Sequence, residues 1–172
     1  AFKGCTSLTS ITIPNSVTEI GDSAFVYCRS LTSVTIPNSV TNIYYSAFEV
    51  CTSLTAINVA TGNKNYVSVN GVLYNKDKTK PICYPAGKKD KNYKIPDGVT
   101  EIGDSAFRDC TSLTNITIPD SVTQIENYAF SGCISLTNVT IPDSVTYISD
   151  IALGYYFDNG YKKIDNFKIY CH

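Results

Sequence analysis

The sequence contains few of the residues on which hydrolytic enzymes and membrane-spanning proteins depend. Its 172 residues include no methionine, and the single histidine is the last residue, His172. A Ser-His-Asp or Cys-His mechanism needs a histidine that neighbouring side chains hold in place, which argues against catalysis. No apolar run approaches about 18 residues, so no transmembrane helix is expected. No signal peptide is visible, and no motif indicates a cofactor.

Cysteine is present, but not in a pattern that indicates disulfide bonds or a metal site. The count of seven is odd. Five of these cysteines share one position of a sequence repeat: Cys5, Cys28, Cys51, Cys110 and Cys133. That position lies next to apolar residues, which predicts small, buried and reduced thiols. Thiols in single file cannot surround a tetrahedral ion and no C-x-x-C motif occurs, so we expect no metal. The redox state of Cys83 and Cys171 stays open.

What the sequence does contain is a repeat of 23 residues, seen in the steps from Cys5 to Cys28 and from Cys110 to Cys133. Aligned on the cysteine, the units are 5–27, 28–50, 51–109, 110–132 and 133–155, followed by an irregular segment at 156–172. A fixed period of this length indicates a solenoid. The third unit has 59 residues, which predicts an insertion at 60–93. The chain opens in mid-repeat, so we read it as a piece of a longer protein.

The shared pattern C-x-x-L-x-x-I-x-I-P-x-S-V-T-x-I-x-x-x-A-F predicts two short strands and a corner in each coil. In the first unit, residues 8–13 are rich in Thr and β-branched residues and predict a strand, which Pro14 ends. Residues 17–20 predict a second strand, and residues 22–25 predict a capped single helical turn. Stacked coils about 4.8 Å apart align equivalent side chains into ladders. One ladder contains Phe25, Phe48, Phe107 and Phe130. We expect a single β-rich solenoid domain over 1–172, with about five coils and short parallel strands on two faces.

The strand pattern L-x-x-I-x-I resembles the L-x-x-L-x-L core of leucine-rich repeats. Its continuation I-P-x-S-V-T-x-I-G-x-x-A-F-x-x-C is similar to the BspA-type leucine-rich repeat, which occurs in surface proteins of host-associated bacteria and some protozoan parasites. The match covers about residues 1–153, and the segments 71–77 and 84–88 resemble inserts of the same family. One departure is Tyr44-Tyr45 in place of Gly-Asp. The resemblance implies a leucine-rich-repeat solenoid, display at the cell surface or secretion, adhesion to host proteins or cells, and no catalytic residues.

The insertion predicts the first candidate binding surface. Residues 66–74 alternate in polarity around an Asn-Gly turn signal, so we expect a hairpin or three-stranded flap that projects from one side. Residues 60–96 contain eight lysines and two aspartates, which gives this segment a net charge of +6, whereas the rest of the chain has a net charge of −7. The lysines either keep exposed hairpin edges from pairing with other chains or form, with tyrosines, a docking site for an anionic glycan or acidic partner. The candidate contacts are Tyr66, Tyr74, Tyr84, Lys76, Lys78, Lys80, Lys88 and Lys89.

A row of polar strand positions predicts a second candidate surface: Ser10, Thr12, Thr35, Thr117 and Thr140. These residues either occur because threonine favours strands on a solvent-exposed face, or they contact a protein or glycan ligand. Nucleic acid is not an expected partner, since the acidic body would repel phosphate. The expected function is non-enzymatic binding or adhesion at a cell surface. The alternative is a structural spacer, or a segment that stacks end to end into fibres.

Overall fold

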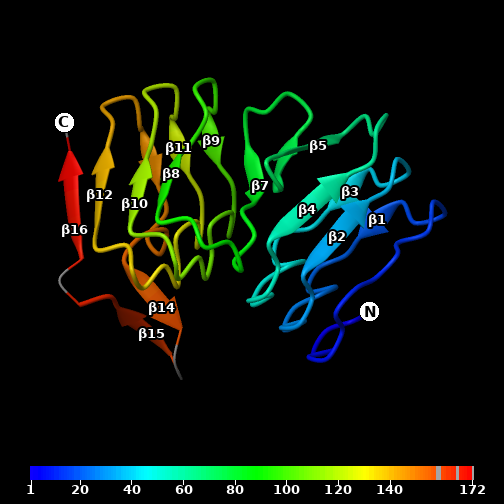
Figure 1. Cartoon of the computed structure of the whole chain (residues 1–172). Helices are drawn as coiled ribbons and strands as arrows, with labels where there is room; N and C mark the ends of the chain where they lie inside the picture. The colour runs from blue at the N-terminus through cyan, green and yellow to red at the C-terminus, as the bar shows by residue number, and fades with distance from the viewer. Residues whose placement is uncertain (158–159, 166, 172) are drawn as a thin grey trace.

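The chain winds into a solenoid of short strands and turns (Figure 1), as the repeat predicts. The structure is a computed structural model that describes residues 1–157, 160–165 and 167–171. Within these ranges no helix occurs, so the chain offers no helical segment that would cross a membrane. The coils are numbered here from the first unit, residues 5–27.

One face of the solenoid, here called the long-strand face, carries strands of three or four residues. They are β2 (Ser33–Ile36), β4 (Ala56–Val59), β8 (Asn92–Lys94), β10 (Asn115–Thr117), β12 (Asn138–Ile141) and β16 (Lys168–Cys171). The pairs β2–β4, β8–β10 and β12–β16 are parallel. Because side chains alternate along a strand, Val34 and Ile36 enter the core while Ser33 and Thr35 face solvent.

The other face, here called the short-strand face, carries strands of two residues each. They are β1 (Glu19–Ile20), β3 (Asn42–Ile43), β9 (Glu101–Ile102), β11 (Gln124–Ile125) and β13 (Tyr147–Ile148). Strand β1 pairs with β3, and β9, β11 and β13 form one parallel sheet. The prediction of short parallel strands on two faces is therefore confirmed. The strand expected at residues 8–13 is not formed, and in this structure that segment has a neighbouring coil on one side.

The one-turn helices predicted at the corners are wrong, because the described residues form hydrogen-bonded turns there. These corner turns cover residues 22–27, 45–50, 104–109 and 127–132. Each contains a residue in the left-handed region, such as Ser23 with a φ of +56° and Ser105 with a φ of +55°. A left-handed residue stops a right-handed helix. The backbone instead bonds to the next coil, as where the Phe25 N–H donates to the Ala47 carbonyl at 2.8 Å.

Repeated polar side chains hold each coil to the one before it. The thiol of Cys51 donates to the Phe25 carbonyl at 3.1 Å, and the thiols of Cys28 and Cys133 make the equivalent bonds. The serine of the pattern makes a similar bond to a valine carbonyl of the preceding coil, at 2.6 to 2.7 Å, in Ser39, Ser121 and Ser144. All seven cysteines are free, and four of the five at the repeat position are buried: Cys28, Cys51, Cys110 and Cys133. The predicted burial is wrong for Cys5, which lies in the first coil and is exposed.

The aromatic ladder is divided into two stacks. The first has three rings with adjacent centroids 5.5 and 5.4 Å apart: Phe2, Phe25 and Phe48. The second has three rings with adjacent centroids 5.3 and 5.2 Å apart: Tyr84, Phe107 and Phe130. Tyr84 thus takes the ring position of a regular coil, and β8 takes the matching place on the long-strand face. The third unit of the sequence therefore contains two coils. The solenoid has one coil more than the five that the repeat units predict.

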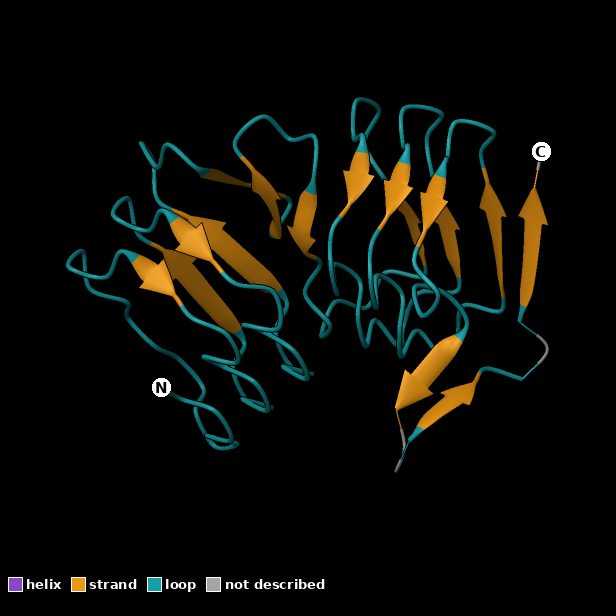
Figure 2. Cartoon of the chain, turned by 180° about the vertical axis from the view of Figure 1, so that it is seen from behind, coloured by secondary structure: helices purple, strands orange, loops and turns teal. Residues whose placement is uncertain are grey.

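The insertion forms the predicted antiparallel sheet, but it does not project. Strands β5 (Tyr66–Val69), β6 (Val72–Asn75) and β7 (Pro81–Cys83) make a three-stranded joining sheet between the two halves of the molecule (Figure 2). Val72, Leu73 and Tyr74 are fully buried. Leu73 packs with the N-terminal stack (1–59), whereas Val72 and Tyr74 pack with the C-terminal stack (84–155). The prediction of a projecting flap is wrong, because these side chains lie between two cores.

The segment after the last regular coil closes the C-terminal end. Strands β14 (Tyr155–Phe157) and β15 (Tyr161–Lys163) form an antiparallel hairpin. The chain then returns to the long-strand face, where β16 pairs in parallel with β12. The edge of β16 that faces away from β12 is exposed along its whole length.

Candidate functional site

The predicted row of threonines lies on the exposed side of the long-strand face. Strand register places Thr35 beside Asn58 and Thr117 beside Lys94. The four hydroxyls of this threonine row form no hydrogen bond with any residue that the structure describes: Thr12, Thr35, Thr117 and Thr140. Ser10 is also exposed. The row is therefore a line of accessible polar groups across both stacks.

Other repeated hydroxyls are used by the fold itself. Thr32 donates to the Thr9 carbonyl at 3.3 Å, and Thr55 donates to the Thr32 carbonyl at 3.1 Å. On the short-strand face, Thr123 donates to the Thr100 carbonyl at 3.1 Å. These threonines bond one coil to the next, whereas the threonine row leaves its hydroxyls available to a ligand.

The five lysines predicted to form a basic docking surface are divided between structural contacts and open surface. Two of them form ion pairs: Lys80 with Glu101, and Lys88 with Asp90. Lys76 donates a hydrogen bond to the carbonyl of Asn63 at 2.6 Å. The other two are exposed and have no ion pair with a described residue: Lys78 and Lys89. Part of the charge thus serves the joint between the stacks.

Two of the three tyrosines predicted to contact a ligand are buried, which corrects that prediction. Tyr74 is fully buried, and its hydroxyl lies 2.6 Å from that of a neighbouring tyrosine. Tyr84 is also buried, and its hydroxyl donates to Asp90 at 2.7 Å. Tyr66 is partly buried, and its hydroxyl accepts a hydrogen bond from the Ile43 N–H at 2.9 Å. These rings stabilise the joint between the stacks rather than an open surface.

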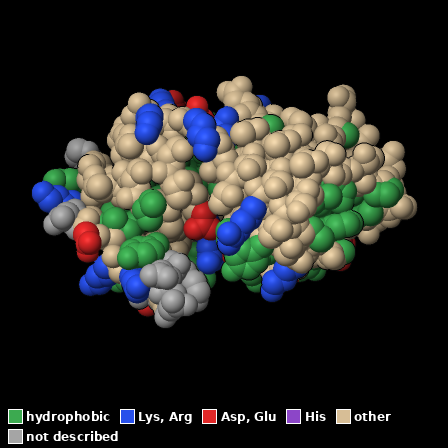
Figure 3. Space-filling view, turned by 60° about the horizontal axis from the view of Figure 1, so that its bottom comes forward, with side chains coloured by type: hydrophobic (Ala, Val, Ile, Leu, Met, Phe, Trp, Pro, Cys, Tyr) green, Lys and Arg blue, Asp and Glu red, His purple; other side chains and the backbone are tan. Residues whose placement is uncertain are grey.

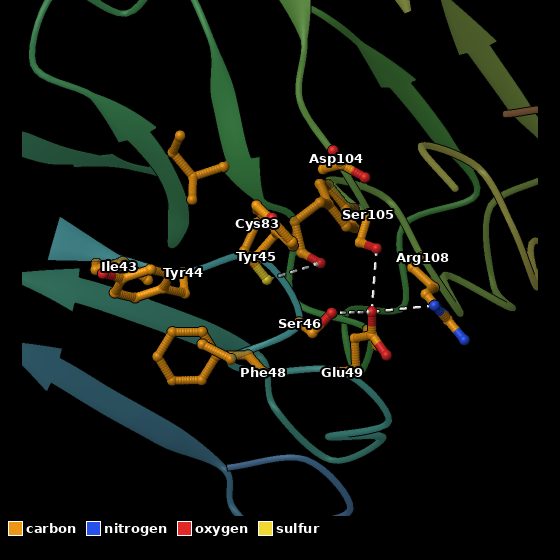
Figure 4. A pocket seen from close by; sticks show the side chains of 14 residues that line it. Ile43, Tyr44, Tyr45, Ser46, Phe48, Glu49, Cys83, Asp104, Ser105 and Arg108 are labelled. Atoms are coloured by element: carbon orange, nitrogen blue, oxygen red, sulfur yellow. Dashed lines mark hydrogen bonds and ion pairs between the residues drawn. The ribbon is translucent and has the colours of Figure 1, made fainter. Parts of the chain in front are cut away.

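A polar cluster that the sequence did not predict links the two stacks (Figure 4). Glu49, from the corner turn of the second coil, accepts a hydrogen bond from Ser46 at 2.7 Å. Across the joint it accepts from Ser105 at 3.1 Å and from Arg108 at 3.0 Å. The side chains of Glu49 and Arg108 are only 14% and 18% exposed. Because the two residues are 59 positions apart, no local pattern in the sequence indicates their pairing.

The surface beside this cluster is hollowed along the corner turns. One hollow of about 460 Å³ is lined by Tyr45, Ser46, Glu49, Asp104, Ser105, Arg108, Asn127 and Tyr128. A second of about 260 Å³ shares Tyr45 and Asp104 and reaches Lys80, Glu101 and Glu126. We call the two together the seam groove. Figure 3, which brings the bottom of Figure 1 forward, shows basic and acidic side chains side by side near the middle of the molecule, between two areas rich in hydrophobic side chains.

Burial controls the ionisation of the stacked thiols and of one groove carboxylate. It raises the pKa of Cys51 from 9.0 to about 12, with a smaller contribution from Cys28. Burial also raises the pKa of Cys83 to about 12, and it raises the pKa of Asp104 against the opposing charge of Lys80. Such thiols are neutral and unreactive at neutral pH. Among the described residues, no group of three or more His, Cys, Asp or Glu side chains could hold a metal ion.

Comparisons with known proteins agree with this architecture. The family model described as BspA type Leucine rich repeat region matches residues 1–80 and 83–169 in six copies. A leucine-rich repeat protein of Eubacterium ventriosum has a TM-score of 0.76 and 37% identity over 81% of this chain. The pneumococcal vaccine antigen PcpA has a TM-score of 0.65 and 28% identity over 83%. A leucine rich cell surface protein of Faecalibacterium prausnitzii has a TM-score of 0.64 and 29% identity over 88%.

The chain spans about half or less of each of these three proteins, at 37%, 47% and 52% of their lengths. No curated protein matches it. The six copies of the family model agree with the additional coil that the structure reveals within the third unit of the sequence.

Proposed function

Because this chain belongs to the BspA-type leucine-rich repeat family, we propose that it is a non-enzymatic binding module of a bacterial cell-surface or secreted protein. The ligand would be a protein or glycan of a host or a neighbouring cell. Two structural relatives, a cell surface protein and a vaccine antigen, support this setting. The family resemblance brings no catalytic motif to the chain, and its single histidine, His172, lies outside the described residues.

The observation that carries the proposal is the threonine row. Its hydroxyls are exposed and form no hydrogen bond within the described part of the chain, whereas threonines at other repeat positions, such as Thr32 and Thr123, bond coil to coil. The row places Thr12 and Thr35 on one stack and Thr117 and Thr140 on the other, so it offers donors and acceptors in two sections to an extended ligand. Solenoids commonly bind along such an extended surface.

The proposal is tested on an array of glycans and extracellular-matrix proteins at physiological salt. The first variant replaces the four threonines of the row by valine, which keeps the branched shape and strand propensity but removes the hydroxyls. A matched control replaces three exposed threonines away from the strands: Thr6, Thr52 and Thr111. We expect the row variant to lose binding and the control to keep it. Equal binding by both variants would move the site away from the row.

A second variant tests the lysines of the insertion. Replacing residues 60–93 by a short turn would remove Leu73 and Tyr74 from the two cores, so charge is changed instead, by Lys78→Gln and Lys89→Gln. Binding lost in this variant alone would favour the insertion as the contact surface. No binding by any folded form would favour the alternative function, a structural spacer or self-assembling segment, which analytical ultracentrifugation over a range of concentrations would test.

A further inference from the structure

The seam groove lies where the repeats depart from their own pattern. At the corner of the first and fourth coils the sequence is Gly-Asp-Ser, at 21–23 and 103–105. The second coil has Tyr-Tyr-Ser at 44–46, and the fifth coil has Glu-Asn-Tyr at 126–128. Both departures place a tyrosine in the groove, as Tyr45 and Tyr128. Since Gly-Asp-Ser serves as the corner elsewhere, the solenoid does not require either tyrosine.

The two tyrosines have different surroundings, since Tyr45 is largely exposed and Tyr128 is partly buried. The side chain of Tyr45 is 63% exposed, more than any other exposed large hydrophobic residue in the described part of the chain. Tyr128 has a φ of +55°, a left-handed conformation that is uncommon for a bulky residue. The same left-handed φ recurs at the equivalent corner residues Ser23, Ser46 and Ser105, so the conformation belongs to the corner, and it is the bulky side chain of Tyr128 that departs from the repeat. The Arg108 guanidinium lies over the Tyr128 ring, 5.2 Å from its centroid, and helps to hold the ring in place.

Hydrogen-bond donors and acceptors line the same groove. Arg108 donates one terminal nitrogen to Glu49 at 3.0 Å, and its Nε lies 3.9 Å from Asp109. A guanidinium carries five N–H donors in all. Asn127 lines the groove and accepts a hydrogen bond from Ser149. The carboxylates of Asp104 and Glu126 form no ion pair with any residue that the structure describes. The groove thus offers donors and acceptors between two aromatic rings.

We propose that the seam groove binds an uncharged oligosaccharide. A sugar ring has an apolar C–H face that packs on an aromatic ring, here Tyr45 or Tyr128, and a rim of hydroxyls that both donate and accept hydrogen bonds. Arg108 and Asn127 supply donors to those hydroxyls, and Asp104 supplies an acceptor. A volume of about 460 Å³ falls within the range of about 300–1,000 Å³ that is usual for ligand pockets.

Charge distinguishes this ligand from the other two candidates. An anionic glycan would bring its charge against the carboxylates of Asp104 and Glu126, which form no ion pair with a described residue; the nearby Lys80 pairs with Glu101 instead. A basic peptide would pair with those carboxylates but would offer few acceptors to the N–H groups of Arg108 that Glu49 does not use. The inference rests on the proposed binding function, but it assigns the ligand to a surface separate from the threonine row.

The test titrates maltohexaose, cellohexaose and chitohexaose into the protein by isothermal calorimetry and saturation-transfer NMR. The variant Tyr45→Asp gives the second coil the aspartate that the first and fourth coils have at this corner. The matched control is Tyr27→Asp, an exposed tyrosine outside the groove at a position where the fourth coil has Asp109. We expect at least one hexasaccharide to bind, the Tyr45→Asp variant to bind about tenfold or more weakly, and the control to bind unchanged.

A heparin hexasaccharide and hexalysine are titrated in parallel at low and high salt. Binding of heparin alone, binding of hexalysine alone with an affinity that falls at high salt, or no binding by any hexasaccharide would each overturn the inference. Equal weakening by Tyr27→Asp would also overturn it. Circular dichroism of both variants shows that they fold. If these sugars fail while ligands on the array still require the threonine row, the inference fails and the proposed function stands.

Discussion

Strands of the regular coils and strands of the joining sheet are buried in different ways. In β2, alternate residues face solvent, so the long-strand face is polar outside and apolar inside. In β6, the consecutive residues Val72, Leu73 and Tyr74 are all buried. A strand with one solvent-exposed side needs alternating polar and apolar residues, whereas a strand between two cores needs apolar residues on both sides. The comparison shows that the strands of the repeat form a solvent-exposed face, whereas the strand that interrupts the repeat connects two cores.

The two stacks on either side of this joint have separate cores. The N-terminal cluster includes Leu73 of β6, and the C-terminal cluster includes Val72 and Tyr74. In repeat proteins each unit contacts only its neighbours, so stability is distributed along the chain. We therefore expect the joining sheet to transmit destabilisation selectively, to one stack or to the other.

The largest expected effect is at the centre of a regular stack. Phe107 is fully buried between Tyr84 and Phe130, and the Phe107→Ala variant should lose about 3–5 kcal/mol of unfolding free energy. Urea denaturation followed by circular dichroism measures the loss. Phe2→Ala, at a ring that is 38% exposed, serves as the control and should cost much less. A loss below about 1 kcal/mol at Phe107 would show that the ring ladder is not packed as described.

The Leu73→Ala variant tests the two-sided burial of β6. Removing this side chain should cost about 2–5 kcal/mol, through a cavity in the N-terminal core alone. Hydrogen exchange followed by mass spectrometry should show faster exchange in residues 20–59 than in residues 95–155. The Tyr74→Phe variant is the counterpart on the other side and should cost about 0.5–1.5 kcal/mol, because one hydroxyl hydrogen bond is lost. If Leu73→Ala accelerated hydrogen exchange equally in both stacks, the result would contradict this arrangement.

A smaller effect is expected where the stacks meet at the surface. The Glu49→Gln variant removes the charge that Arg108 pairs with at 3.0 Å and should cost about 1–3 kcal/mol, because the guanidinium is left partly buried. Glu19→Gln, at an exposed residue that accepts from Asn42 at 3.0 Å, is the matched control. A thermal melt compares the two variants. Equal melting temperatures would show that the polar cluster contributes nothing to the joint.

The last expected effect is absent at neutral pH and grows with pH: a dependence of stability on alkaline pH. The folded-state pKa of Cys51 is raised from 9.0 to about 12, so the folded protein holds this proton after the unfolded chain has released it. The thiol makes its full contribution to the free energy of unfolding below pH 9.0, and this contribution is lost as the pH rises through about 12. Urea midpoints measured from neutral pH upward should fall in that window. A Cys51→Ala variant should show a shallower fall, and an identical slope would contradict the assignment.

The coils could be predicted because their signals lie within one repeat. The alternation around Val34 and the proline that ends the segment indicate a strand without any knowledge of its neighbours. The corners were mispredicted, because the left-handed φ of Ser23 depends on how the turn bonds to the next coil. The additional coil was missed because Tyr84 lacks the Ala-Phe signature, although residues 95–100 carry the I-P-x-x-V-T half of a coil and imply a first half before it.

The candidate sites differ in the same way. The exposure of the threonine row follows from strand alternation, so Thr35 and Thr117 were named from the sequence and lie on the surface. The burial of Tyr74 and Tyr84 was missed, because the run of three apolar residues at 72–74 is too short to distinguish a strand buried on both sides from a hairpin with one exposed side. The departures from the repeat at 44–45 and 126–128 are visible in the sequence, but their meaning depends on what lies across the joint.

By itself the sequence determined the period, the two strand faces, the stacked rings and thiols, and the family. These features repeat every 23 residues and involve contacts between equivalent positions of adjacent coils. Only the tertiary structure decided that the insertion joins two cores and that a groove lies at the seam. The physical reason is that these features depend on contacts such as Glu49 with Arg108, 59 positions apart, which form only after the two stacks have packed against the joining sheet.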